Sequence, residues 1–201
     1  RWFVCWLYIN IYINKFLKKL KMKFIFRFMI LAIVASFLSS CAFQNLEDYS
    51  DEKPVFDLEK FFDGNTTGWG IVQDRSGKVT KRFIVKIVGN FSSDKGTLDE
   101  QFKWSDGKTE QRIWKLKKIN ANQWIGMADD VIGQASGTIS GNSLKWEYTL
   151  KLELENGSVN VKFEDWMYLI DDKVLMNKAK FSKFGFFLGE VTLSFIKSDY
   201  L

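Results

Sequence analysis

The sequence predicts an all-β protein, an antiparallel meander of about 8–10 strands that forms a closed or nearly closed barrel after one short helix. From Trp69 onward, apolar and polar residues alternate with a period of two, as in strands with one buried and one wet face. Turn-forming residues interrupt this alternation at regular intervals. The single proline, Pro54, lies before the first predicted strand. Because no later proline protects a sheet edge, we favour a barrel over a sandwich, although both remain open.

The elements follow in order along the chain. A short helix is expected over residues 57–62, because Leu58, Phe61 and Phe62 share one face at helical spacing. The clearest strand covers residues 143–154, and two further clear alternations cover 159–169 and 187–195. Weaker strands fit residues 69–73, 79–88, 97–104, 109–119, 123–128, 133–139 and 174–184. The strongest hairpin signals are Asp106-Gly107 and Asn156-Gly157.

Residues 22–41 have the layout of a secretory leader. A short basic start precedes an apolar run over residues 28–38, and Leu38-Ser39-Ser40-Cys41 matches a bacterial lipobox. We therefore predict a signal peptide over residues 22–40 and a lipid on Cys41. Residues 1–21 are interpreted as an upstream extension with translation starting at Met22, the alternative being an unusually long leader.

The segment after Cys41 indicates how the domain is attached. Residues 41–56 are acidic and contain Pro54, which is typical of a tether, and residues 57–201 form the predicted barrel domain. Alanine rather than aspartate follows the cysteine. By resemblance to the sorting of Gram-negative lipoproteins, this residue favours the outer membrane, with the domain facing the periplasm. The lipid is the expected contact with the membrane.

Charge and composition exclude several functions. Seven of the 29 basic residues lie in residues 1–41, which contain no acidic residue, so the remainder has 22 basic and 24 acidic residues. Nucleic acid is therefore not an expected partner. The chain has no histidine, and its two cysteines are Cys5 and Cys41. This removes histidine-dependent nucleophilic catalysis and histidine-ligated metals, and we expect no metal and no cofactor.

Five polar residues share the parity of the apolar residues in their predicted strands. They are Gln73, Glu100, Arg112, Asp165 and Asn177. In one interpretation they converge inside the barrel and orient a ligand whose bulk is apolar. In the other, Arg112 pairs with Glu100 or Asp165 and seals one barrel end, since a buried charge needs a partner. The structural interpretation is favoured, because buried ion pairs commonly serve no ligand.

For three other residues the sequence predicts a position in the fold but no functional role. Asp129 and Asp130 are neighbours, and neighbours in a strand point to opposite faces, so a turn or solvated edge is the expected role. Trp166 has outward parity. It is expected either to pack on the helix of residues 57–62 or to face the membrane.

Three segments and the lipobox together resemble a known family. The segments Thr67–Phe83, Gly126–Gly137 and Phe163–Phe195 are similar to the proteobacterial lipoproteins grouped as the domain of unknown function DUF3833. The resemblance implies a cell-envelope lipoprotein and no assigned activity. A looser likeness to lipocalins is architectural only. The residues that fall inside the shared motifs are Trp69, Gln73, Arg75, Asp129, Asp130, Asp165, Trp166, Asn177, Lys183 and Phe184.

The leading functional hypothesis is a binding module. An outer-membrane lipoprotein would hold an apolar or amphipathic envelope molecule, such as a lipid or fatty acid, inside its barrel. One alternative is a docking partner for another envelope protein, with a filled core. A third is a glycan hydrolase that uses Glu100 and Asp165 as a carboxylate pair.

Overall fold

The computed structural model describes residues 44–154 and 157–197. The chain divides into two units, and the second, Asn45–Leu201, contains every element discussed below. The predicted signal peptide, the extension before it and the lipidation site Cys41 lie outside the described residues. The predictions about them therefore stay predictions, as do the proposed domain boundaries.

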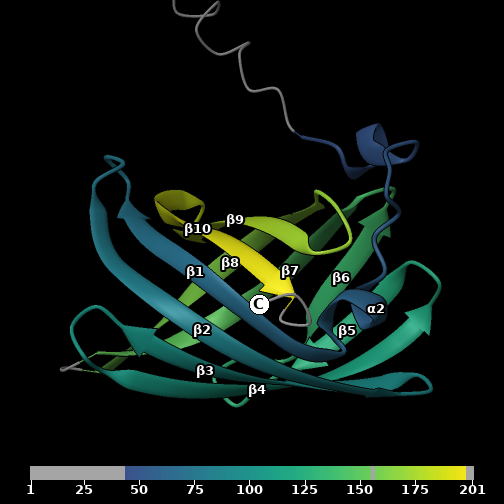
Figure 1. The fold of residues 1–201 in the computed structure, drawn as a ribbon. Helices are drawn as coiled ribbons and strands as arrows, with labels where there is room; N and C mark the ends of the chain where they lie inside the picture. Colours follow the sequence, from purple (N-terminus) through teal and green to yellow (C-terminus); the bar gives the residue numbers. More distant parts are fainter. Residues whose placement is uncertain (1–43, 155–156, 198–201) are drawn as a thin grey trace, which may run out of the picture. The chain divides into compact units, whose positions relative to one another are not determined.

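Within the described residues, two short helices precede ten strands (Figure 1). The helices are the 3-10 turn η1 (Leu46–Tyr49) and α2 (Leu58–Phe62). The strands are β1 (Gly64–Asp74), β2 (Val79–Ser92), β3 (Lys95–Trp104), β4 (Thr109–Asn120), β5 (Gln123–Met127), β6 (Ala135–Ser140), β7 (Ser143–Leu154), β8 (Gly157–Leu169), β9 (Val174–Lys183) and β10 (Phe186–Lys197).

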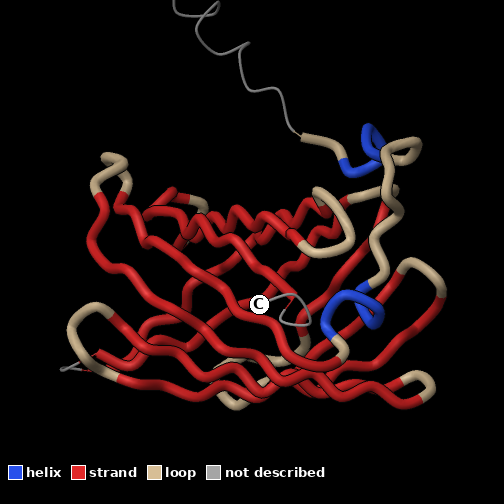
Figure 2. Tube along the Cα trace, in the orientation of Figure 1, coloured by secondary structure: helices blue, strands red, loops and turns tan. Residues whose placement is uncertain are grey.

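The ten strands form one closed antiparallel barrel. Each strand pairs with its neighbours in sequence, and β1 pairs with β10 from Thr66 opposite Lys197 to Asp74 opposite Gly189. In Figure 2 the strands, drawn in red, curve around into one barrel. The prediction of an all-β closed barrel with one short helix before it is thus confirmed. No helix within residues 44–154 and 157–197 is long and apolar enough to cross a membrane.

Helix α2 closes one end of the barrel. Asp57 caps the helix by accepting a hydrogen bond from the Lys60 amide, 3.1 Å. Leu58 and Phe62 are buried and line the interior, and the Phe62 ring meets Phe195 edge-on with centroids 5.6 Å apart. The Phe62 carbonyl lies directly over Gly89 of β2, where a Cβ atom would overlap it. The absence of a side chain at Gly89 therefore lets the helix sit on the barrel.

Gly89→Ala is expected to destabilise the domain by about 1–3 kcal/mol, because the added methyl group pushes the backbone of α2 off the barrel. Thermal unfolding followed by circular dichroism measures the effect. Asn90→Ala, at the exposed neighbouring position, is the control and should melt like the parent. Equal melting temperatures for both variants would show that α2 does not depend on this contact.

The first strand faces the interior with the opposite parity from the one predicted. Gly68 and Gly70 face inward, and Trp69 is 41% exposed on the outside. The rings of Phe195 and Phe83 occupy the space over Gly68 and Gly70, respectively, so glycine is needed for close packing. Gln73 shares the parity of Trp69 and does not line the interior. Its side-chain amide donates to the Gly77 carbonyl in the β1–β2 turn, 3.0 Å.

Candidate ligand cavity

The barrel encloses a cavity of about 430 Å³. Leu58 and Phe62 of α2 line its closed end. Thr80, Lys81 and Glu110 also line it but are solvent-exposed, so they mark the mouth. These three residues lie beside the β1–β2 and β3–β4 turns. The mouth is therefore at the end opposite α2, and the volume falls within the range of small-molecule sites.

Most of the cavity wall is apolar and aromatic. On one side Phe83 packs against Phe102 and Trp104, with ring centroids 5.6 Å and 4.9 Å apart. On another, the Trp114 ring meets Trp146 and Tyr148 edge-on, at 5.7 Å and 5.4 Å. Contacts between neighbouring rings, tilted in the first group and edge-to-face in the second, hold these side chains against the wall. Such a wall favours a ligand whose main bulk is hydrocarbon.

Arg112 on β4 supplies the positive charge of the cavity. Its guanidinium donates in a bidentate fashion to Asp130, with Nε to Oδ2 at 2.9 Å and a terminal nitrogen to the same oxygen at 2.7 Å. The other terminal nitrogen is 3.8 Å from Glu100 Oε2 on β3. The contact with Asp130 is the stronger one, because 3.8 Å exceeds hydrogen-bonding distance. The predicted ion pair with Glu100 is present, but Asp130 is the principal partner, and it was not predicted.

Asp130 reaches Arg112 because the β5–β6 loop runs along β7. The Ile132 amide donates to the Thr149 carbonyl and the Lys151 amide donates to the Asp130 carbonyl, each at 2.8 Å. Val131 forms an isolated bridge with Leu150. Asp129 and Asp130 thus lie in a turn, as predicted. Asp129 is exposed, whereas the Asp130 side chain is held against Arg112.

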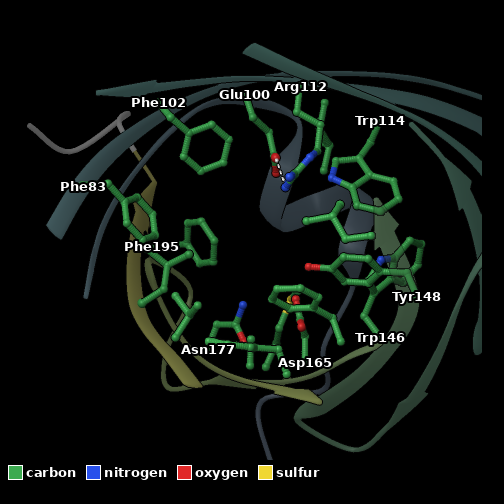
Figure 3. Close-up of a pocket in the computed structure, with 18 of the residues that line it drawn as sticks. Phe83, Glu100, Phe102, Arg112, Trp114, Trp146, Tyr148, Asp165, Asn177 and Phe195 are labelled. Carbon is green, nitrogen blue, oxygen red and sulfur yellow. Dashed lines mark ion pairs between the residues drawn. The ribbon is translucent and has the colours of Figure 1, made fainter. Parts of the chain in front are cut away.

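Asp165 on β8 and Asn177 on β9 form a second polar group on the opposite wall (Figure 3). Each is only 6% exposed. One carboxyl oxygen of Asp165 and the side-chain oxygen of Asn177 are buried without a hydrogen-bond partner in the protein. In Figure 3 they lie across the open centre from Glu100 and Arg112, and the Tyr148 hydroxyl points between the two groups. Unsatisfied buried acceptors are costly, so this wall is suited to a ligand that donates hydrogen bonds.

Burial changes the ionisation of these groups. It raises the pKa of Glu100 to about 7, an effect that the Arg112 charge only partly offsets. It also raises the pKa of Asp165 to about 7, against the opposing effects of Asn177, Arg112 and Tyr148. Burial alone would lower the pKa of Arg112, but the nearby Glu100 raises it. The cavity is therefore close to electrically neutral below pH 7 and becomes negative above it.

Four of the five predicted interior residues line this cavity, namely Glu100, Arg112, Asp165 and Asn177, and Gln73 does not. Tyr148 was not singled out, although its hydroxyl on the dry face of residues 143–154 follows the same parity rule. The role of the predicted residues in ligand binding stays a prediction. The motif residues Trp69, Arg75 and Lys183 lie outside the cavity, Arg75 in the exposed β1–β2 turn and Lys183 at the end of β9.

Trp166 lies on the outer face of β8, as its parity predicted. It is 4% exposed because η1 covers it, with the Tyr49 ring 6.1 Å away. The prediction that it packs on the helix of residues 57–62 or faces the membrane is therefore wrong. Its indole nitrogen donates to Glu164, 3.1 Å, and Lys145 lies over its ring. Trp166 holds the N-terminal segment on the barrel wall.

The carboxyl groups do not form a metal site or an evident hydrolytic pair. Within the described part of the chain, no three histidine, cysteine, aspartate or glutamate side chains gather as metal ligands would. Glu100 is ion-paired with Arg112 and its side chain is 13% exposed. This arrangement speaks against the hydrolase alternative, since a general acid or base must reach both substrate and water.

The fold and the cavity define a lipocalin-like barrel with a ligand-sized interior. The chain belongs to the DUF3833 family, described as a protein of unknown function, whose model matches residues 35–197. No curated protein matches the sequence.

Three solved structures are similar to this chain, and the first of them supports the fold. The S-type phycobiliprotein lyase CPES from Guillardia theta superposes with a TM-score of 0.54 at 7% identity, covering 77% of this chain and 98% of the lyase. A DUF3598-family protein of unknown function from Nostoc punctiforme has a TM-score of 0.49 at 13% identity. The match covers 73% of this chain and 51% of that protein. The structure of EF1p2_mFAP2b bound to DFHBI has a TM-score of 0.37 at 11% identity. The match covers 69% of this chain and 95% of that protein.

Proposed function

We propose that this protein binds an apolar or amphipathic small molecule inside its barrel. The observation that carries the proposal is the unfilled cavity, in which buried acceptor oxygens of Asp165 and Asn177 have no partner in the protein. A docking protein with a filled core has no need for an aromatic-walled void of about 430 Å³. The lipocalin-like fold supports this role, because barrels of this size can enclose one small ligand.

The polar groups narrow the chemistry of the ligand. Its bulk is hydrocarbon, which suits the aromatic walls, and its head donates hydrogen bonds to Asp165 and Asn177. Hydroxyl, amide and protonated carboxyl heads meet this requirement. An ionised carboxylate is disfavoured above pH 7, where Glu100 and Asp165 carry charge. Neutral lipids such as monoacylglycerols are therefore favoured over ionised fatty acids.

We also propose that the domain works in the cell envelope. The lipobox sequence that ends at Cys41 supports attachment by a lipid, and Ala42 supports the outer membrane, with the barrel facing the periplasm. The described domain begins at the closed end of the barrel. Just before α2, the Phe56 amide donates to the Gly141 carbonyl in the β6–β7 turn, 2.8 Å. Residues 44–56, the described part of the tether, therefore lie at the end of the barrel opposite the mouth.

Native mass spectrometry of residues 42–201, exported without the lipid anchor, tests the proposal. This segment contains the whole barrel with its own core. We expect adducts that survive purification, leave on denaturation and have the masses of neutral or weakly acidic lipids. A protein that is free of adducts and also takes up neither monolaurin nor laurate would shift the assignment to a docking role.

A further inference from the structure

The β9–β10 hairpin ends in an exposed apolar tip. We define the tip as residues 183–188. Phe184 is 88% exposed, Phe186 75%, Phe187 44% and Leu188 38%. Isolated apolar residues on a surface are ordinary, but four within five consecutive positions at the end of a hairpin are not. Folding buries little of this apolar surface, which indicates that it has a partner outside the domain.

The backbone of the tip is arranged to expose these side chains. Lys183 pairs with Phe186, so Phe184 and Gly185 form a two-residue turn in which both have positive φ, 51° and 81°. Asparagine or aspartate normally occupies the first such position, because a bulky side chain is strained there. The register of β9 and β10 then shifts between Phe187 and Gly189. A bulge redirects side chains, and here Phe186, Phe187 and Leu188 are all exposed.

The tip lies at the mouth of the cavity. Phe181 and Val191, on the two strands that lead into it, line the cavity wall. Because Asp74 pairs with Gly189, the β1–β2 turn is the neighbour of the tip on one side. Lys81, just beyond that turn, lines the mouth itself. A surface that binds the tip is therefore next to the route by which a ligand enters or leaves.

Basic side chains lie in the tip and on the neighbouring β1–β2 hairpin. The ammonium group of Lys183 lies over the Phe184 ring, 5.2 Å from its centroid. The neighbouring β1–β2 hairpin adds three exposed cations, Arg75 and Lys78 in the turn and Lys81 at the start of β2. Glu190 is paired with Lys178 at 3.3 Å, so Asp74 in the turn, which accepts hydrogen bonds from the Ser76 and Lys78 amides, is a single carboxylate facing several cations. The charge next to the apolar tip is thus positive.

We propose that the β9–β10 tip inserts into the surface of an anionic lipid bilayer and places the cavity mouth against it. Aromatic side chains partition into the headgroup region, and lysine keeps its charge in water while its stem lies along apolar groups. Cations next to the inserted groups gain from anionic headgroups. The tip is at the opposite end of the barrel from α2, and its contact with the bilayer does not depend on which molecule fills the cavity.

Vesicle co-sedimentation of residues 42–201 tests the inference. Vesicles of phosphatidylethanolamine with phosphatidylglycerol are compared with pure phosphatidylcholine. We expect binding to the anionic vesicles that weakens at high salt, and a loss of about tenfold or more in the double variant Phe184→Ser/Phe186→Ser, because two rings no longer leave water. Lys183→Glu should also weaken binding. Ile170→Ser, which removes a 56% exposed residue at the closed end, is the matched control and should bind like the parent.

A fluorescent variant gives an independent reading. Phe184→Trp should show blue-shifted emission and quenching by brominated lipids when anionic vesicles are added, whereas Ile170→Trp should show neither. Equal sedimentation of the parent and the double serine variant would overturn the inference. A parent dimer that the double variant converts to a monomer, with no vesicle binding, would instead assign the tip to a second copy of the chain. Lipid adducts in native mass spectra would be unaffected by either result, so the cavity proposal is tested separately.

Discussion

Replacing Ala179 with phenylalanine is expected to weaken ligand binding strongly while the barrel stays folded. Ala179 is 4% exposed, lines the cavity and pairs with Asp165 across β8 and β9. A ring at this position occupies the space beside the two unsatisfied acceptors, where the ligand head is proposed to lie. We expect the affinity for monolaurin to fall on the order of a hundredfold, since each 1.4 kcal/mol of lost contact is worth a factor of ten.

The measurement is a native mass spectrometric titration with monolaurin, with thermal unfolding as the test of folding. Lys178→Phe is the matched control, because it adds the same ring to the exposed outer face of the same strand. The Lys178 ion pair with Glu190 is at the surface and contributes little to stability. If Ala179→Phe melts like the parent and still binds monolaurin with the parent affinity, the ligand does not occupy the cavity.

Large apolar residues make the inner face of a strand readable from the sequence. Glu100 lies between Leu98 and Phe102, and Asp165 between Phe163 and Met167, so their inward direction follows from alternation alone. Both line the cavity. On β1 two central inner positions, Gly68 and Gly70, are glycines, which carry no hydrophobic signal, and the apolar residues Trp69 and Ile71 point outward. The alternation rule therefore fails where the partner strands supply the core side chains.

Contacts between distant segments could not be predicted in this way. Asp130 pairs with Arg112 only because the β5–β6 loop follows β7, and no local pattern specifies that path. Tyr49 covers Trp166 from a segment that was interpreted as a tether. In both cases the sequence identifies the residue, but only tertiary packing determines which residue it contacts.

The buried carboxyl of Asp165 should make the domain less stable at high pH. Its pKa is about 7 in the folded protein and near 3.8 when unfolded, so between these values the native state holds the proton more tightly. The contribution of this group to stability is therefore greatest below about pH 4, falls as the pH rises towards 7, and is then constant. Asp165→Asn removes the ionisation and is expected to stabilise the protein at pH 8 by a few kcal/mol, or several degrees in melting temperature. The gain should shrink as the pH is lowered to 5.

The neighbouring Glu164 provides the control with the opposite sign. It points outward, and although partial burial alone would raise its pKa, hydrogen bonds from Trp166 and Lys145 lower it overall. The contribution of Glu164 to stability is present at a pH above the pKa that it has in the unfolded chain. It is lost as the pH falls through the lower pKa that it has in the folded protein. Glu164→Gln should thus destabilise the protein at pH 8, where Asp165→Asn stabilises it. Thermal unfolding of both variants at pH 5 and pH 8 tests this, and a destabilising Asp165→Asn at pH 8 would mean that the Asp165 carboxylate is held in its charged form by a partner in the folded protein. In that case the acceptor oxygens would not be available to a ligand, and the proposed hydrogen-bonding head would lose its site.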